Sequence, residues 1–309
     1  PAILSELIKV SGDPLYPNIA RATALTLLAQ YPGEESTGAY NLALADADAL
    51  IRYTALSHVG ASTPERLAEL VSPLLFDPVQ AVRGEASNRL ADAPAGTLKP
   101  YQEEALASGL DEYRESMRSA LDFPSAAYNL GNLSSRVGDL AEAEEFYRKA
   151  LRIDDLFVPA KANLALLLNS TGRNREAEAL LREALEAYPD RSDIAYNLGL
   201  LLAEMNRVGE AVEFLGRASR GQPGQARVHY NFGLALQAVE RYEEAEDALQ
   251  LALETEPENP DFLFALGEHY IRRGAPERAL ELANRLLDLV PTHPQGQQLR
   301  AAAEQALRR

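Results

Sequence analysis

Asparagine recurs at one fixed spacing through the second half of this 309-residue chain. An asparagine amide both donates and accepts hydrogen bonds, so a row of such amides can hold the backbone of an extended peptide without reading its side chains. Aromatic residues stand at the position just before, where they add contact area at a low entropic cost. The asparagine row is Asn129, Asn163, Asn197 and Asn231, and the aromatic residues are Tyr128, Tyr196, Tyr230 and Phe264.

The asparagine row belongs to a pattern of 34 residues that the chain repeats five times. One copy begins with Tyr-Asn-Leu-Gly at 196–199, has a small residue at Ala211 and ends at Pro223. Apolar residues recur three and four positions apart in two stretches of each copy, which predicts two amphipathic helices. Small residues allow the paired helices to approach closely. The pattern resembles the tetratricopeptide repeat (TPR), a helix–turn–helix unit with this period.

The TPR resemblance implies an all-α fold in which helix pairs stack into an α–α superhelix, a right-handed solenoid. The turn after the first helix calls for a left-handed residue, usually glycine, and Glu240 suits that position poorly. We also expect a connecting helix from about Pro100 to Leu121 and a capping helix after the last repeat. The expected segments are 96–123 for the connection, 124–157, 158–191, 192–225, 226–259 and 260–293 for the repeats, and 294–309 for the cap.

A looser repeat occupies residues 1–95, where an arginine recurs at intervals of 31 residues. An aspartate or an Asp-Pro pair, which is a helix-start signal, precedes each arginine. This arrangement resembles HEAT-like helical repeats, and we expect intervening helices at Glu35–Leu44 and Pro64–Leu75. The arginines are Arg21, Arg52 and Arg83, and the signals before them are Asp13-Pro14, Asp46 and Asp77-Pro78.

The TPR resemblance also implies that the first helix of each repeat lines a concave groove, where a partner would contact the asparagine row. The same residue types occur at these positions for packing one repeat on the next, so both roles stay open. TPR domains that bind chaperone tails use lysines, which are missing from the positions near the helix starts: Ser125, Pro159, Asp193, Arg227 and Asp261. The predicted partner-binding residues are Tyr128, Asn129, Asn132, Arg136, Asn163, Tyr196, Asn197, Arg227, Tyr230, Asn231, Phe264 and Arg272.

The composition argues against several other functions. The chain carries 46 acidic and 30 basic residues, a formal net charge of −16, whereas nucleic-acid binding needs clustered lysine and arginine. It has no cysteine, four scattered histidines, and no glycine-rich phosphate loop or other catalytic motif. No apolar run reaches the roughly 20 residues that cross a bilayer. We therefore expect no enzyme activity, no cofactor, no bound metal and no membrane span.

The order of the two repeat regions is similar to the C-terminal half of bacterial proteins in which a multihaem cytochrome c region precedes HEAT-like and TPR repeats. The segments 21–25, 51–56, 74–83, 112–113 and 129–133 carry this resemblance. It implies the scaffold part of an exported electron-transfer protein, periplasmic or at the cell surface, without the haem-binding part.

We predict a non-catalytic scaffold that binds a protein or an extended peptide in the TPR groove. Two alternatives remain open. One is a structural module that self-associates into homo-oligomers or filaments through the solenoid ends. The other is an accessory domain of an enzyme whose catalytic part lies outside this chain.

Overall fold

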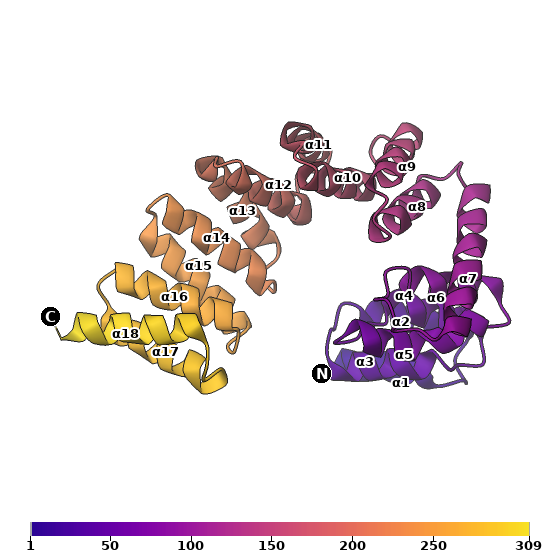
Figure 1. Ribbon diagram of the computed structural model, residues 1–309, viewed down its shortest axis with the longest axis horizontal. Helices are drawn as coiled ribbons and strands as arrows, with labels where there is room; N and C mark the ends of the chain where they lie inside the picture. Colours follow the sequence, from indigo (N-terminus) through magenta and orange to yellow (C-terminus); the bar gives the residue numbers. More distant parts are fainter. Residues whose placement is uncertain (1, 309) are drawn as a thin grey trace. The chain divides into compact units, whose positions relative to one another are not determined.

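The computed structural model describes residues 2–308, which form eighteen α-helices and one 3₁₀ helix (Figure 1). No strand occurs among these residues, so the all-α prediction is confirmed. The chain divides into two compact units, Pro1–Asp155 and Leu156–Arg309. The first unit contains α1 (Ala2–Gly12), α2 (Asn18–Leu28), α3 (Glu34–Ala43), α4 (Ala49–His58), α5 (Pro64–Val71), η1 (Ser72–Phe76), α6 (Gln80–Arg89), α7 (Pro100–Ser119), α8 (Pro124–Arg136) and α9 (Leu140–Ile153). The second contains α10 (Val158–Ser170), α11 (Asn174–Ala187), α12 (Ser192–Glu204), α13 (Val208–Gly221), α14 (Ala226–Ala238), α15 (Tyr242–Thr255), α16 (Pro260–Arg272), α17 (Pro276–Leu289) and α18 (Pro294–Leu307).

Two rows of short helices form the beginning of the first unit. One row runs from α2 to α4 to α6, with each helix in contact with the next. α1 and α3 belong to the other row, and α1 contacts α3 in its own row and α2 in the first row. Leu25, Ile51 and Val82 lie on successive helices of the first row and are fully buried in a shared core. The apolar core therefore continues from one helix pair to the next, as stacked repeats require.

The expected helix Pro64–Leu75 is wrong in its last part. The α-helix α5 ends at Val71, and Ser72–Phe76 continue as the 3₁₀ helix η1. Pro73 has no amide hydrogen to donate to the preceding turn, and its ring crowds that turn, so the α-helix stops before it. The connecting helix α7 is also shorter than expected, because it ends at Ser119 rather than near Leu121.

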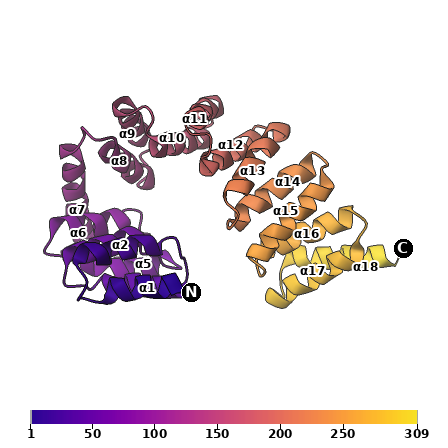
Figure 2. The same cartoon turned by 180° about the vertical axis from the view of Figure 1, so that it is seen from behind.

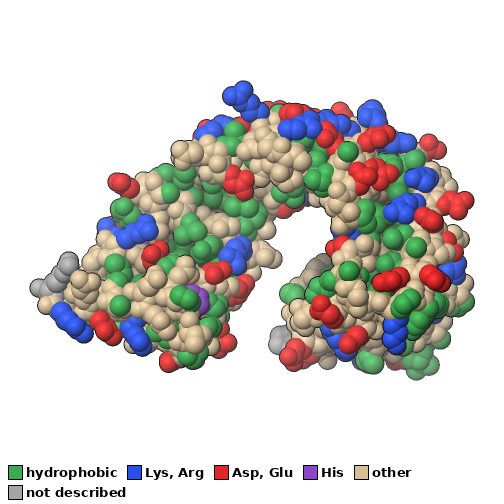
Figure 3. All heavy atoms as spheres, in the orientation of Figure 1, with side chains coloured by type: hydrophobic (Ala, Val, Ile, Leu, Met, Phe, Trp, Pro, Cys, Tyr) green, Lys and Arg blue, Asp and Glu red, His purple; other side chains and the backbone are tan. Residues whose placement is uncertain are grey.

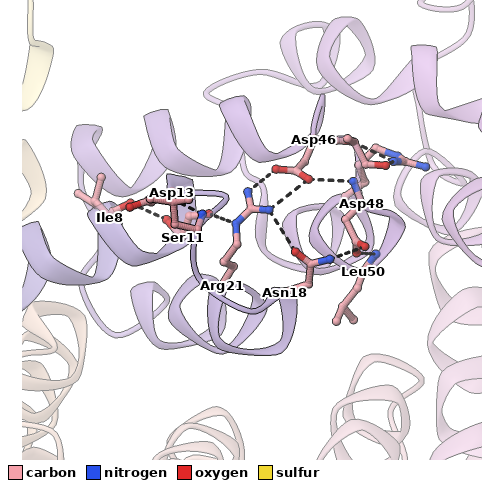
Figure 4. Close-up of polar contacts among 11 residues, drawn as sticks. Ile8, Ser11, Asp13, Asn18, Arg21, Asp46, Asp48 and Leu50 are labelled. Atoms are coloured by element: carbon pink, nitrogen blue, oxygen red, sulfur yellow. Dashed lines mark hydrogen bonds and ion pairs between the residues drawn. The ribbon is translucent and has the colours of Figure 1, made fainter.

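The recurring arginines of the first unit each reach an acidic residue of the following helix pair, and we call these contacts the arginine ladder. Figure 4 shows the pair made by Arg21. Arg52 donates two hydrogen bonds to the Asp77 carboxylate, at 2.7 and 2.9 Å, and these side chains are 11% and 4% exposed. Burial alone would raise the pKa of Asp77, but hydrogen bonds from Arg52 and the Val79 amide outweigh it and lower the pKa. The ladder pairs are Arg21–Asp46, Arg52–Asp77 and Arg83–Glu112.

The second unit stacks helix pairs at the 34-residue period. The first helices α10, α12, α14 and α16 begin at residues 158, 192, 226 and 260. Gly199 explains one of the small residues in the pattern, because a Cβ atom there would lie 2.7 Å from the Leu215 side chain. Ala211 on the paired helix is fully buried. The helices of a pair therefore touch through positions where a larger side chain does not fit.

The turn after the first helix of a pair uses a left-handed residue. Gly172 and Gly274 have positive φ, which glycine adopts without strain. Asn206 has φ 60° and Glu240 has φ 63° at the equivalent positions. Glu240 therefore takes the left-handed conformation despite its side chain, at a cost of about 1–2 kcal/mol.

Charged side chains of both signs are intermixed on the surface of each unit (Figure 3). In the second unit Arg207 pairs with Glu178 at 2.5 Å and with Glu210 at 2.7 Å. Arg182 also pairs with both glutamates. Local pairing of this kind neutralises part of the negative charge of the surface.

Candidate functional site

The first helices of the pairs in the second unit form one continuous face, which we call the first-helix face. α10 contacts α12, α12 contacts α14, and α14 contacts α16. Both ribbon views show the helices α12 to α16 following one another in chain order (Figures 1 and 2). Packed helices have axes about 8–10 Å apart, which about three residues of extended peptide can span. Side chains at equivalent repeat positions are therefore spaced suitably for an extended chain.

The middle of the first-helix face holds a tyrosine and two members of the asparagine row. Asn231 of α14 donates a hydrogen bond from Nδ2 to the hydroxyl oxygen of Tyr196 on α12, at 2.6 Å. Asn197 follows Tyr196 and is half-buried, and its amide has no hydrogen-bond partner among residues 2–308. Asn231 thus joins two repeats, whereas the donor and acceptor of its equivalent Asn197 make no hydrogen bond within the described residues.

Arg227 of α14 is held between an acidic and two aromatic side chains. Its guanidinium lies 3.3 Å from Oδ2 of Asp261 on α16. It also lies 5.3 Å from the ring centroid of Tyr230 and 5.2 Å from that of Phe262. Burial, assisted by the negative charge of Asp261, raises the pKa of Tyr230. These contacts fix the Tyr230 side chain and neutralise the arginine.

The outlying predicted residues of the second unit have different surroundings. Asn163 of α10 is half-buried. Phe264 of α16 is half-buried and packs against the core of the last helices. Arg272, at the end of α16, is exposed, and its guanidinium lies 3.8 Å from the Glu268 carboxylate. The structure therefore brings Tyr196, Asn231 and the Arg227 group together on adjacent helices, with Arg272 at the margin.

Four predicted residues lie on α8, in the first unit. Tyr128 lies 6.1 Å from the ring of Tyr147 on α9, and the Tyr147 hydroxyl donates to Oδ1 of Asn132 at 2.9 Å. These contacts join the two helices of one pair.

The other two predicted residues of α8 contact earlier helices. Arg136 donates to both the backbone carbonyl and the side-chain oxygen of Asn88, near the end of α6. The Asn129 amide nitrogen lies 3.8 Å from the sulfur of Met117 on α7. Arg136 thus packs α8 against the helices before it, with its guanidinium hydrogen-bonded to α6.

The buried histidine His229 of α14 has structural surroundings. His229 is 1% exposed, and its ring nitrogens lie 2.8 Å from the Ser219 hydroxyl and 3.0 Å from the Pro223 carbonyl oxygen. Across residues 2–308, no group of three or more histidine, aspartate or glutamate side chains is placed to hold a metal ion. Within the same range, every helix is too short or too polar to cross a membrane.

Two family models described as tetratricopeptide repeat match the sequence. One matches residues 136–190 and 168–234, and the other matches residues 230–294. Residues 136–294 are tetratricopeptide repeats. The predicted family is therefore confirmed for that segment, which includes the whole first-helix face. No curated protein sequence matches the chain.

Solved structures share the TPR solenoid. YrrB, described as a TPR protein with an unusual peptide-binding site, is 24% identical with a TM-score of 0.53, over 60% of this chain and 96% of YrrB. MamA of Desulfovibrio magneticus RS-1 is 21% identical with a TM-score of 0.51, over 55% of this chain and 97% of its own. Pseudomonas aeruginosa PilF is 23% identical with a TM-score of 0.54, over 72% and 98%. Identities this low show the fold alone.

Two contacts of the first-helix face were not predicted from the sequence. Arg227 and Asp261 stand 34 residues apart, so opposite charges occupy one repeat position in successive units. That spacing was a usable signal for the ion pair. The bond between Tyr196 and Asn231 spans 35 residues and follows equally from stacking adjacent repeats.

Proposed function

We propose that the chain is an interaction scaffold whose TPR array binds an extended peptide segment of a partner protein on the first-helix face. The observation that carries this proposal is Asn197, a half-buried amide with an unengaged donor and acceptor. A peptide backbone offers one donor and one acceptor per residue and is the natural complement of such a group. Tyr196 stands beside it and already accepts a bond from Asn231, which fixes its orientation.

The aromatic groups of the face support the same function. Tyr230 rests 5.0 Å from the Phe262 ring and lies under the Arg227 guanidinium. A side chain held in one orientation before binding loses little entropy when a ligand arrives. Tyr230 is therefore suited to anchor an apolar side chain of the peptide.

The charged side chains of the first-helix face are paired with one another, which favours binding of a peptide through its uncharged groups. Asp261 is paired with Arg227, and Asp193 is paired with Arg191 at 2.6 Å. Pairs of opposite charge leave little net field at this surface, although the whole chain carries −16. We expect peptide affinity to depend weakly on ionic strength, because screening acts on unpaired charges.

A solved neighbour adds support by analogy. YrrB is described as having a peptide-binding site, and its fold matches 60% of this chain. A shared fold is compatible with the same kind of ligand, but the proposed peptide binding rests on the side chains described above.

The test begins with selection of peptides from a random library on the full chain, followed by calorimetry with single substitutions. Asn197→Ala should weaken binding by about 0.5–1.5 kcal/mol, the worth of a neutral hydrogen bond. Tyr230→Ala should cost more, because aromatic anchors dominate such interfaces. Neither side chain is fully buried, so helix content should stay unchanged.

Asn284→Ala is the matched control, because Asn284 is an exposed asparagine on the second helix α17. It should leave affinity unchanged. If the selected peptides bind all three variants as they bind the wild type, the ligand lies elsewhere and the proposal is wrong.

The narrower prediction, that the chain is part of an exported multihaem cytochrome system, rests on the sequence resemblance. Purification of the chain from its own host with bound partners tests it. Haem-stained partners would support it, and partners without c-type haem would contradict it.

A further inference from the structure

An apolar groove lies between α1 and α2, the first two helices of the first unit. It has a volume of about 440 Å³ and is lined by Ile3, Leu7, Val10, Ile19, Thr23 and Leu27, among others. Two of these side chains, Ile3 and Ile19, are 62% and 68% exposed. Large aliphatic side chains exposed together commonly mark a binding surface.

The 31-residue period shows what covers the equivalent surface elsewhere in the same unit. Thr54 on α4 and Glu85 on α6 occupy the position of Thr23, and each is only 9% exposed. α2 contacts α4, and α4 contacts α6, so each of these helices has a preceding neighbour in its row. Thr23 is exposed. The face of α2 is therefore built like an internal packing surface, but no helix among residues 2–308 covers it.

Asp13, directly after α1, shares one contact with the aspartates of the arginine ladder. Asp46 accepts a hydrogen bond from the Asp48 amide at 2.8 Å and is also paired with Arg21. Asp13 accepts the same type of bond from the Leu15 amide, at 2.9 Å. No arginine among the described residues pairs with Asp13.

We propose that this groove binds an amphipathic helix of a partner protein, with an arginine of that helix paired to Asp13. The groove supplies apolar contact, and Asp13 supplies a carboxylate. In the arginine ladder the Asp77 carboxylate accepts two parallel hydrogen bonds from a guanidinium, and we expect the same contact at Asp13. Glu6 also lines the groove, with the Lys9 ammonium 3.8 Å from its carboxylate. The site is separate from the first-helix face and does not depend on the function proposed for it.

A second copy of the chain fits this site poorly. All three ladder arginines are already paired within their own chain. Two copies meeting through the same groove would also bring Asp13 and Glu6 of each toward like charges, which is unfavourable. The occupant therefore has to bring its own arginine.

The test uses a hydrocarbon-stapled helical peptide with the sequence of residues 17–31, because α2 is the helix that covers the equivalent face of α4. The peptide should bind the full chain. Asp13→Asn keeps the acceptor for the Leu15 amide but removes the charge, and should weaken binding about tenfold or more. Replacing the arginine of the peptide, Arg21→Ala, should weaken binding equally. Glu104→Gln, at an exposed site on α7, is the control and should have no effect.

A second variant guards against loss of folding. Thr23→Arg places a bulky cation in the groove at an exposed position, so it should abolish binding while the melting temperature stays unchanged. Absence of binding by the helical peptide would overturn the proposal. Binding that is equal for Asp13→Asn and wild type would also overturn it. Dimerisation of the chain that Thr23→Arg abolishes would identify a second copy as the occupant and overturn the assignment to a partner.

Discussion

The first unit and the TPR array join one repeat to the next with different chemistry. In the arginine ladder a guanidinium reaches a nearly buried carboxylate of the following helix pair. In the TPR array the helices meet through small residues, and neutral groups such as Tyr196 and Asn231 connect adjacent repeats. A ladder pair fails when either partner is lost, whereas a small-residue contact fails when volume is added. Two helical repeat regions with similar periods therefore differ in which substitutions they tolerate.

The largest effect is expected for Asp77→Ala. Removing the carboxylate leaves the Arg52 guanidinium largely buried without its partner, and breaking a buried pair costs about 3–5 kcal/mol. Urea unfolding measures the change in the free energy of unfolding. Asp111→Ala is the control, since Asp111 is 81% exposed beside Arg114 and should cost less than about 1 kcal/mol. Equal costs for the two would remove the distinction between the ladder and surface pairs.

A somewhat smaller effect is expected for Ala211→Trp in the TPR array. Ala211 is fully buried at the contact between paired helices, and overpacking costs about 1–3 kcal/mol. Glu213→Trp, at an exposed position on the same helix, should leave the melting temperature nearly unchanged. Unchanged melting for Ala211→Trp would show that the helices do not meet at this residue.

Glu240→Gly should stabilise the TPR array by about 1 kcal/mol. The residue has φ 63°, and glycine adopts this conformation without the side-chain clash. Glu243→Gly, at an exposed position in the first turn of the following helix, should instead destabilise. Thermal unfolding of both variants distinguishes the turn from the helix. A destabilising Glu240→Gly would contradict the left-handed turn.

The smallest effect concerns mild acid. Burial opposes ionisation of Asp46, but hydrogen bonds from Arg21 and the Asp48 amide outweigh it, so the pKa of Asp46 is lowered, as is that of Asp77. A carboxyl with a lowered folded pKa adds stability above its unfolded pKa, and loses it as pH falls through the folded pKa. Near pH 4 the loss should be only about a few tenths of a kcal/mol per carboxyl, and it should grow at lower pH. Hydrogen exchange at pH 7 and pH 4 should show α4 and α6 loosening before α14. The reverse order would contradict the comparison.

The helices could be predicted because the sequence repeats its helix-start signals and apolar spacing. The capping helix Pro294–Leu307 and the pairs at residues 158, 192, 226 and 260 follow that pattern. The failure at Pro73 came from reading apolar spacing across a residue that ends an α-helix. At Glu240 the stacking of the repeats imposed a turn that local preference opposes.

The candidate site was less predictable, because repeat position does not say which asparagine is already bonded. Asn231 and Asn197 are equivalent in sequence, yet only Asn231 bonds to Tyr196. The difference depends on what stands at the same position one repeat earlier, which is Tyr196 for Asn231 and Ala162 for Asn197. The HEAT-like assignment of residues 1–95 and the role of the site residues stay predictions.

The most direct test of the central claim is an amide chemical-shift map of the full chain with a peptide selected from the library. If the peptide lies on the first-helix face, the shifts should concentrate in α12, α14 and α16, with the side-chain amide of Asn197 among the largest. Shifts confined to the second helices α11, α13, α15 and α17, with the Asn197 amide unmoved, would contradict it.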